Sequence, residues 1–422
     1  MKKLFFAAVA IAMVALTAVS CGPDDKKTPE GGKLTPDENK AKVEDVALDL
    51  AGQIDAQKFV EFVDATNRLT DIGLPEDLMG EEEPTRGAVS AIVNAAAPMF
   101  PSRMGAIAAI PAAATRVADI AASQFYGVFT YDEQTEEWTS TESTTELAFI
   151  YGFEGAEVKL SLVTSGSETE VEFDGTIIAV PAKVAAKMTM DGETLAAIAV
   201  DVTSIATDLS SGEVGTTVEI GGYSFALKAK IASDSSASLT LKNGSKTLVS
   251  INATGTETDL IPPMTDEPNF EATIGDLNVN LNVMDAVYVK GSIDDLQGLI
   301  DAEEELGYED EEYAEAYTKL INDHVDIFMN YDNSNAAIAT VEYKHFYEVE
   351  KSEDGLAEIH SSYGEYYIVF ASDDSRFSLE EFFNDEDFAD LKEAVEKLDK
   401  EFSDLLGIED ELDEPNNEPA GR

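Results

Sequence analysis

The sequence predicts an α+β fold: a large curved antiparallel β-sheet, a meander of hairpins, with its apolar face covered by N- and C-terminal helices. Period-2 alternation of apolar and polar residues dominates the middle of the chain, from Phe125 to about Lys290. Glycine-containing dipeptides typical of tight hairpin turns punctuate this stretch. Helical patterns flank it on both sides, and a sheet with one apolar face needs such a cover.

The charge of the chain restricts its partners. Its 422 residues include 28 Lys and Arg against 84 Asp and Glu, which gives a formal net charge of −56 at pH 7. A field of this sign repels nucleic acid, whose phosphates are bound by releasing counterions to cationic side chains. Hydrophobic residues make up 44% of the chain, too many for a disordered protein. We therefore expect a folded, acidic protein that does not bind nucleic acid.

The N-terminus has the pattern of a secretion signal, which we assign to residues 1–20. Lys2 and Lys3 precede an uncharged apolar stretch, residues 4–16, and small residues lead into Cys21. This stretch is shorter than the roughly 20 residues of a membrane-spanning helix. Cys21 is the only cysteine, which excludes an intramolecular disulfide and a cysteine-based zinc site.

Residues 18–21, with the sequence Ala-Val-Ser-Cys, resemble the lipobox of bacterial lipoproteins. The resemblance implies that Cys21 is lipidated and that the membrane is a partner of the mature chain. Asp24 and Asp25 are similar to the export signal of surface lipoproteins of the Bacteroidota, and an ordinary solvated linker is the alternative. We interpret residues 21–34 as the lipidated N-terminus and a flexible tether. The resemblance implies an outer-membrane lipoprotein at the cell surface, with the periplasmic leaflet as the alternative, and it implies no activity.

Residues 35–123 form the predicted N-terminal helical segment. Thr35 begins a capping box, and a second helix is predicted over residues 55–69 because apolar residues recur on one face. Residues 87–123 are rich in Ala and interrupted by three prolines. We interpret them as short helices packed against the sheet. Insertion into the membrane is the alternative, and the charged side chains within this stretch disfavour it.

Residues 124–292 form the predicted β meander. Leu277, Val279 and Leu281 alternate with asparagines, so the strand is apolar on one face only. Six dipeptides are predicted to supply the turns: Glu154-Gly155, Asp174-Gly175, Asp191-Gly192, Gly221-Gly222, Asn243-Gly244 and Gly275-Asp276.

Residues 293–407 are predicted to add helices and further strands to the sheet. Helices are expected from Leu296 to Leu306 and from Tyr313 to Phe328, and strands at about 338–370 around the turn Asp354-Gly355. The last helix carries an apolar stripe at 3-4 spacing, Phe388, Leu391, Val395, Leu398, Phe402 and Leu405. We expect this stripe to dock on the sheet, with a coiled coil as the alternative. Residues 408–422 are an acidic tail.

The sequence offers few groups for catalysis. It contains no Gly-x-Ser-x-Gly, HExxH or P-loop motif, and only three histidines. We expect His324 to be a hydrogen-bonded boundary residue, whereas His345 and His360 flank a turn and form a candidate metal pair. Residues 332–335, Asp-Asn-Ser-Asn, are a weak calcium candidate because the glycine and glutamate of an EF-hand loop are missing. No cofactor is predicted.

The aromatic region near residues 343–370 is the candidate ligand site. Tyr343, Tyr363, Tyr366 and Tyr367 are expected either to form a platform that stacks on sugars or to pack beneath the C-terminal helix. The favoured function is a lipid-anchored extracytoplasmic binding or interaction protein without catalytic activity. A carrier of a lipid or other hydrophobic ligand in a half-barrel cavity and a glycan hydrolase are the alternatives, so a glycan, a lipid or a protein is the expected ligand.

Overall fold

The computed structural model confirms the α+β fold and describes most of the body of the protein. The described residues are 34–73, 126–173, 176–207, 211–232, 234–256, 275–306, 310–331, 337–351, 358–384 and 387–406. The predicted signal peptide with Cys21, the Ala-rich stretch 87–123, the turns at 174–175 and 354–355, residues 332–335 and the tail 408–422 lie outside them.

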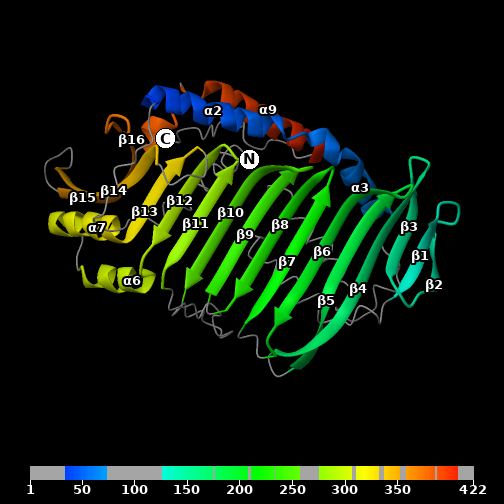
Figure 1. The fold of residues 1–422 in the computed structure, drawn as a ribbon. Helices are drawn as coiled ribbons and strands as arrows, with labels where there is room; N and C mark the ends of the chain where they lie inside the picture. The colour runs from blue at the N-terminus through cyan, green and yellow to red at the C-terminus, as the bar shows by residue number, and fades with distance from the viewer. Residues whose placement is uncertain are drawn as a thin grey trace, which may run out of the picture.

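A single 16-stranded sheet forms the body of the molecule (Figure 1). Its order, β16-β15-β14-β13-β12-β11-β10-β9-β8-β7-β6-β5-β4-β3-β1-β2, follows the chain almost throughout and leaves the sheet open. The strands are β1 Gly127–Asp132, β2 Glu137–Glu142, β3 Leu147–Phe153, β4 Ala156–Phe173, β5 Thr176–Met190, β6 Glu193–Ile205, β7 Gly212–Ile220, β8 Tyr223–Ile231, β9 Asp234–Asn243, β10 Lys246–Thr256, β11 Leu277–Val283, β12 Val287–Ile293, β13 Val325–Asn330, β14 Ala339–Lys351, β15 Glu358–Phe370 and β16 Arg376–Ser378.

Three predicted dipeptides, Glu154-Gly155, Asp191-Gly192 and Gly221-Gly222, form their hairpin turns, whereas the turn after β9 uses Gly244 and Ser245 because Asn243 is still in the strand. Asp191 and Gly192 between β5 and β6 have φ of 49° and 85°, and Gly221 and Gly222 between β7 and β8 have 56° and 84°. Positive φ at both central residues gives the turn a twist that matches the strands it joins. Gly275-Asp276 is different, because it directly precedes β11 at the end of a longer connection from β10.

Seven helical elements are described. They are α2 Pro36–Gly52, η1 Ala56–Phe59, α3 Val60–Ile72, α6 Leu296–Glu305, α7 Glu311–His324, α8 Leu379–Phe382 and α9 Ala389–Leu406. The capping box at Thr35 is confirmed, because its side chain and that of Glu38 bond to each other's backbone N–H groups. The predicted second helix is present as η1 followed by α3. No helix in the described ranges is both long and apolar enough to cross a membrane.

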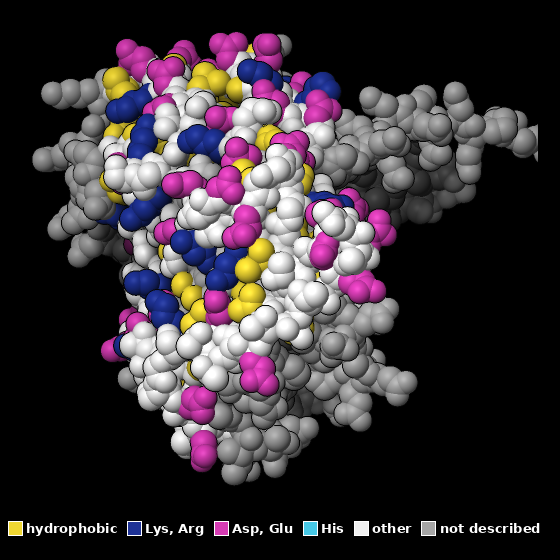
Figure 2. All heavy atoms as spheres, turned by 90° about the vertical axis from the view of Figure 1, so that its right-hand side faces the viewer, with side chains coloured by type: hydrophobic (Ala, Val, Ile, Leu, Met, Phe, Trp, Pro, Cys, Tyr) yellow, Lys and Arg dark blue, Asp and Glu magenta, His cyan; other side chains and the backbone are white. Residues whose placement is uncertain are grey.

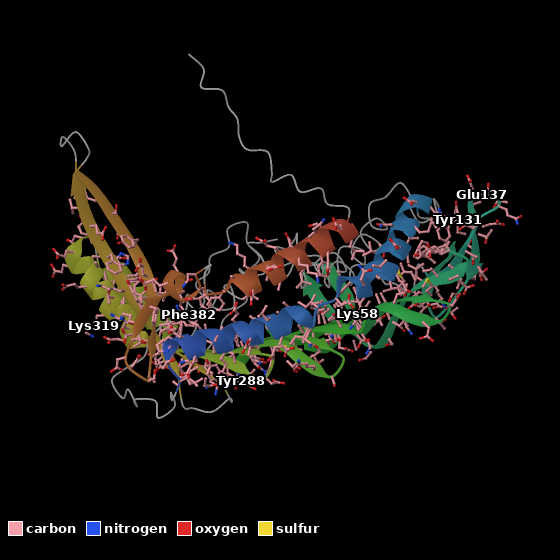
Figure 3. The ribbon with its side chains drawn as sticks, turned by 90° about the horizontal axis from the view of Figure 1, so that it is seen from above. Lys58, Tyr131, Glu137, Tyr288, Lys319 and Phe382 are labelled. Atoms are coloured by element: carbon pink, nitrogen blue, oxygen red, sulfur yellow. The ribbon has the colours of Figure 1, made fainter. Side chains whose placement is uncertain are left out.

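Seen from above, the sheet is an arc, and α2, α3 and α9 lie within its hollow (Figure 3). We call the side of the sheet that faces these helices the concave face and the other side the convex face. Phe59, Phe62 and Leu69 are buried against the central strands, as the helical pattern predicted. The stripe of α9 is buried at its start, at Phe388 and Leu391, and half-buried further along. The prediction that this helix docks on the body of the protein is therefore confirmed.

One predicted helix is too long. The expected helix from Tyr313 to Phe328 ends at His324, and Phe328 lies in β13. Its apolar residues recur at helical spacing, but Val325 and Ile327 also alternate as a strand requires, and both are buried against neighbouring strands. Pairing of β13 with β12 therefore outweighs continuation of the helix.

Candidate functional site

The β14–β15 hairpin extends beyond the rest of the sheet and carries the candidate site. β13 pairs with β14 only at Phe328–Thr340 and Met329–Ala339, whereas β14 and β15 stay paired out to Lys351. Figure 3 shows this hairpin, in yellow-brown, rising away from the arc at the end opposite β2. We call residues 343–349 and 360–367 the aromatic arm.

Helix α7 covers the edge of β14 that β13 leaves open. The Asn322 side chain donates to the carbonyl oxygen of Tyr343 at 2.7 Å and accepts from its N–H at 3.0 Å. The N–H of His345 donates to the Thr318 hydroxyl at 2.8 Å. An open strand edge is a template for pairing with other chains. Side chains of α7 satisfy this part of the edge and hold the arm in place.

One face of the aromatic arm is covered by α7. Tyr343 is buried there, with its ring centroid 5.0 Å from that of Tyr366 and 5.7 Å from that of Tyr317. Burial raises the pKa of the Tyr343 hydroxyl well above its usual range. Two of the four predicted ligand-contacting tyrosines, Tyr343 and Tyr366, therefore form part of the packing between helix and sheet.

A chain of hydrogen bonds crosses this covered face. His345 Nδ1 lies 2.7 Å from the Tyr343 hydroxyl, and His345 Nε2 lies 2.8 Å from the Ser362 hydroxyl. A serine beside a histidine resembles a nucleophile with its base, but catalytic triads orient the histidine with a carboxylate that stabilises the imidazolium. Tyr343 is a neutral phenol. This chain of hydrogen bonds joins the two strands and does not form a catalytic triad.

The opposite face, which we call the open face, continues the convex face of the sheet. Phe346 and Tyr363 stack there with ring centroids 5.2 Å apart and ring planes at 18°. Lys344 Nζ lies 4.5 Å from the centre of the Phe346 ring. Tyr363 is 40% exposed, and its hydroxyl donates to Glu348 Oε1 at 2.9 Å. These contacts fix the Tyr363 ring in place although it is exposed to solvent.

Tyr367 lies on the same open face, nearer the body of the sheet. Its hydroxyl donates to Glu365, and this bond to a carboxylate raises the pKa of Tyr367 to about 12. The guanidinium of Arg376 lies 5.1 Å from the centre of its ring and forms an ion pair with Glu342. The open face therefore offers aromatic rings flanked by carboxylates and cations.

The structure does not bring the candidate metal pair together. In the register of β14 and β15, His345 lies opposite Gly364 and His360 lies opposite Val349, so four residues along the strand separate the histidines. His360 Nδ1 instead lies 2.6 Å from the hydroxyl of Tyr347. The described ranges contain no group of three or more potential metal ligands.

His324 and the carboxyl groups favour no catalytic role. His324 is half-buried at the end of α7, with Nδ1 3.2 Å from the carbonyl oxygen of Asp294, as expected of a boundary residue. Among the described carboxyl groups, the pKa shifts that stand out are those of Glu38, Asp373 and Asp387, and hydrogen bonds lower all three. The general acid of a glycosidase needs a raised pKa. The described residues therefore provide no support for the hypothesis of a glycan hydrolase.

The sequence identified the aromatic region but missed part of the open face. Phe346, Lys344 and Glu348 share that face with Tyr363 because they alternate along β14, a signal that becomes usable only when the register of β15 is known. A scan against protein-family models found no match to this chain, and searches of curated proteins and of solved structures found none.

Proposed function

We propose that the protein is a lipid-anchored extracytoplasmic binding protein without catalytic activity, and that its ligand contacts the open face of the aromatic arm. The observation that carries this proposal is Tyr363, a large ring that is 40% exposed yet fixed by Phe346 and Glu348. A fixed exposed ring loses little conformational entropy on binding. Rings beside carboxylates fit ligands with an apolar face and a hydroxylated rim, such as the pyranose rings of a glycan.

The test is binding of the mature chain, held in detergent micelles, to a glycan array. We expect Tyr363→Ala to weaken binding to a retained glycan by about tenfold or more, because truncation of a central aromatic contact has effects of this size. Ile300→Ala is the matched control, since Ile300 is 42% exposed on α6 and is not part of the open face. Equal binding by both variants and the unaltered chain would contradict the proposal.

The anchor is tested separately in cells. Cys21→Ala removes the only thiol of the chain, so we expect loss of lipid labelling and release from the membrane. Accessibility of the intact protein to an added protease would then distinguish the cell surface from the periplasmic leaflet. Continued membrane residence of Cys21→Ala would contradict the anchor without affecting the binding proposal.

A carrier of a hydrophobic ligand is the second candidate. The sheet is open, and Leu227, Leu239 and Ile251 on the concave face of β8–β10 are only half-buried. A carrier would retain lipid, so native mass spectrometry of the protein purified without added lipid tests this reading. A co-purifying lipid-sized mass would support the carrier, and a clean protein mass would contradict it.

A further inference from the structure

The convex face of β8–β12 differs in charge from the rest of the protein. Along these strands every second side chain packs into the core beneath the helices. The side chains between them therefore point away from the helices. On β8 and β9 these outward residues include Lys228, Lys230, Ser238, Thr240 and Lys242. On β10 to β12 they include Ser250, Asn252, Thr254, Asn278, Asn280, Asn282, Lys290 and Ser292. We call these residues, together with Ser236, the convex band.

The convex band contains no carboxylate, although acidic residues outnumber basic ones by 84 to 28 in the chain. Carboxylates lie at its borders: Glu213 on β7 is opposite Lys230, Asp285 bonds to Asn282, and Asp234 and Asp326 lie on β9 and β13. Figure 2 looks at the end of the molecule formed by β1–β3, and its Lys and Arg side chains gather in the left half, the side of the convex face. Asp and Glu side chains lie among them in that view, and the convex band contributes the lysines of β8 and β9 to the convex face.

Three lysines of the band are available to a ligand. Lys228, Lys230 and Lys242 are exposed, and none forms an ion pair with another described residue. At physiological ionic strength, charges more than about 8 Å apart in solvent are largely screened. Glu213 lies within this range of Lys230, but a ligand over Lys228 and Lys242 interacts with their ammonium groups more strongly than with carboxylates farther along the sheet.

The rest of the band forms a regular array of hydrogen-bonding groups. The register places Ser238, Asn252, Asn280 and Lys290 side by side across β9–β12. Amides and hydroxyls both donate and accept hydrogen bonds, which suits the hydroxyl groups of a sugar. Asn280 Oδ1 is buried and has no hydrogen-bond partner in the described structure. A ligand hydroxyl or a bridging water would supply the missing donor if the Asn280 side chain rotated towards the surface.

We propose that the convex band binds an acidic polysaccharide, with its carboxylate groups at the lysines and its hydroxyls on the array of Ser, Thr and Asn. The band is a second surface, built from residues that the open face of the aromatic arm does not include. Charge complementarity selects the anionic groups of this ligand, and the uncharged array selects its hydroxyls. A polyanion without sugar hydroxyls satisfies only the first of these requirements.

The test compares three polymers of similar length: oligogalacturonide, neutral dextran oligomer and single-stranded DNA. The mature chain in detergent micelles is titrated with each by isothermal calorimetry. We expect oligogalacturonide to bind more tightly than dextran and DNA, and its affinity to fall as salt is added. No binding of oligogalacturonide would overturn the proposal. Equal binding of DNA would show that the band responds to charge alone, and equal binding of dextran would show that the lysines are not used; either result overturns the proposal.

Two sets of variants remove the same charge from different places. The triple variant Lys228→Gln, Lys230→Gln and Lys242→Gln is expected to weaken oligogalacturonide binding by about tenfold, as the loss of three exposed ionic contacts would. The matched control replaces Lys319, Lys397 and Lys400 by Gln, all of them exposed on helices. Equal weakening by both triples would overturn the proposal.

A further pair of variants separates the band from the aromatic arm. Asn252 is exposed in the array, and Asn252→Asp places a carboxylate of the same shape among the lysines. We expect it to weaken binding of oligogalacturonide, and Ile300→Ala, which lies outside both surfaces, to leave that binding unchanged. Loss of oligogalacturonide binding in Tyr363→Ala but not in Asn252→Asp would locate the acidic ligand on the arm and overturn the proposed site while leaving the binding function of the arm intact.

Discussion

The ring of Tyr343 lies over Gly364, its diagonal neighbour on the adjacent strand. A Cβ atom built on Gly364 would come 2.6 Å from the Cε2 and Cζ atoms of this ring, closer than packed atoms approach. Tyr343 pairs with Tyr366 and His345 pairs with Gly364, so the ring leans across the hairpin towards the position without a side chain. The glycine therefore allows the ring to be buried and its hydroxyl to reach His345.

We expect Gly364→Ala to destabilise the protein by about 1 to 3 kcal/mol, the usual cost of overpacking, although alanine suits a strand better than glycine. Urea unfolding measures the change. The control is Gly215→Ala on β7, where an added Cβ would meet nothing closer than Lys228 Cγ at 3.7 Å, an ordinary contact. A double variant that also carries Tyr343→Leu should lose less stability than the sum of the single variants. Additive losses would mean that the ring does not cause the effect.

Tyr223 fixes the turn after α2 to the sheet. It is almost fully buried, and its hydroxyl donates to the carbonyl oxygen of Gln53 at 2.7 Å and accepts from the N–H of Asp55 at 2.8 Å. Tyr223→Phe leaves the Asp55 N–H without its partner, so we expect a loss of about 1 to 3 kcal/mol in urea unfolding. Tyr363→Phe, on an exposed ring, should change stability by less than about 0.5 kcal/mol. Similar values for both variants would contradict this role of Tyr223.

Asp387 should make stability depend on pH through Lys40. Lys40 is buried beside the rings of Phe377 and Phe382 and lies 2.5 Å from Asp387. Hydrogen bonds from Lys40 and Asn384 hold the pKa of Asp387 below its usual range. The stabilisation is therefore fully present above the unfolded pKa of about 3.9 and is lost as pH falls through the lower folded value.

We accordingly expect Asp387→Asn to lower the melting temperature at neutral pH, with a difference from the unaltered chain that shrinks as the pH falls below about 4. Thermal unfolding followed by circular dichroism at a series of pH values measures this. Asp404→Asn removes an exposed pair with Lys400 and should have little effect at any pH. A difference at Asp387 that does not change with pH would show that its charge is not responsible.

The docking of α9 predicts a large effect at Leu391. This side chain is 5% exposed and belongs to a cluster with Phe370 and Phe388. We expect Leu391→Ala to cost about 2 to 5 kcal/mol by leaving a cavity. Lys397→Ala on the exposed side of the same helix controls for helix propensity. A melting temperature equal to that of the control would mean that the start of the stripe is not packed.

Glycine made much of the sheet predictable, and turns without glycine gave no such signal. Asp191-Gly192 and Gly221-Gly222 were recognisable because glycine adopts positive φ readily. The turn between β11 and β12 uses Met284 and Asp285, at φ of 58° and 52°. The side chain of Asn282 bonds to both the backbone N–H and the carboxylate of Asp285 and so holds the turn. Methionine has no preference for such a turn, so composition gave no signal there.

The candidate site depended on a register that the sequence does not specify. Tyr343 and Tyr363 belong to the same aromatic region, yet the pairing of β14 with β15 places one under α7 and the other in solvent. A shift of one residue would exchange the two faces. The same uncertainty left open whether His345 and His360 approach each other, and the register keeps them apart. Residue type therefore predicted a candidate binding surface, and only the pairing shows which rings are exposed on the open face.

The contact between α2 and α9 has a consequence for how the chain acquires its structure. The hairpins of the sheet join neighbours in sequence and can form as the chain becomes available, but α2 packs beside α9, which ends at Leu406. Contacts this distant in sequence form slowly because a long loop must close first. In an exported chain, α2 would thus lack its packing partner until α9 is available. We expect truncations before α9 to leave a foldable sheet with an exposed apolar helix, a target for chaperones and proteases.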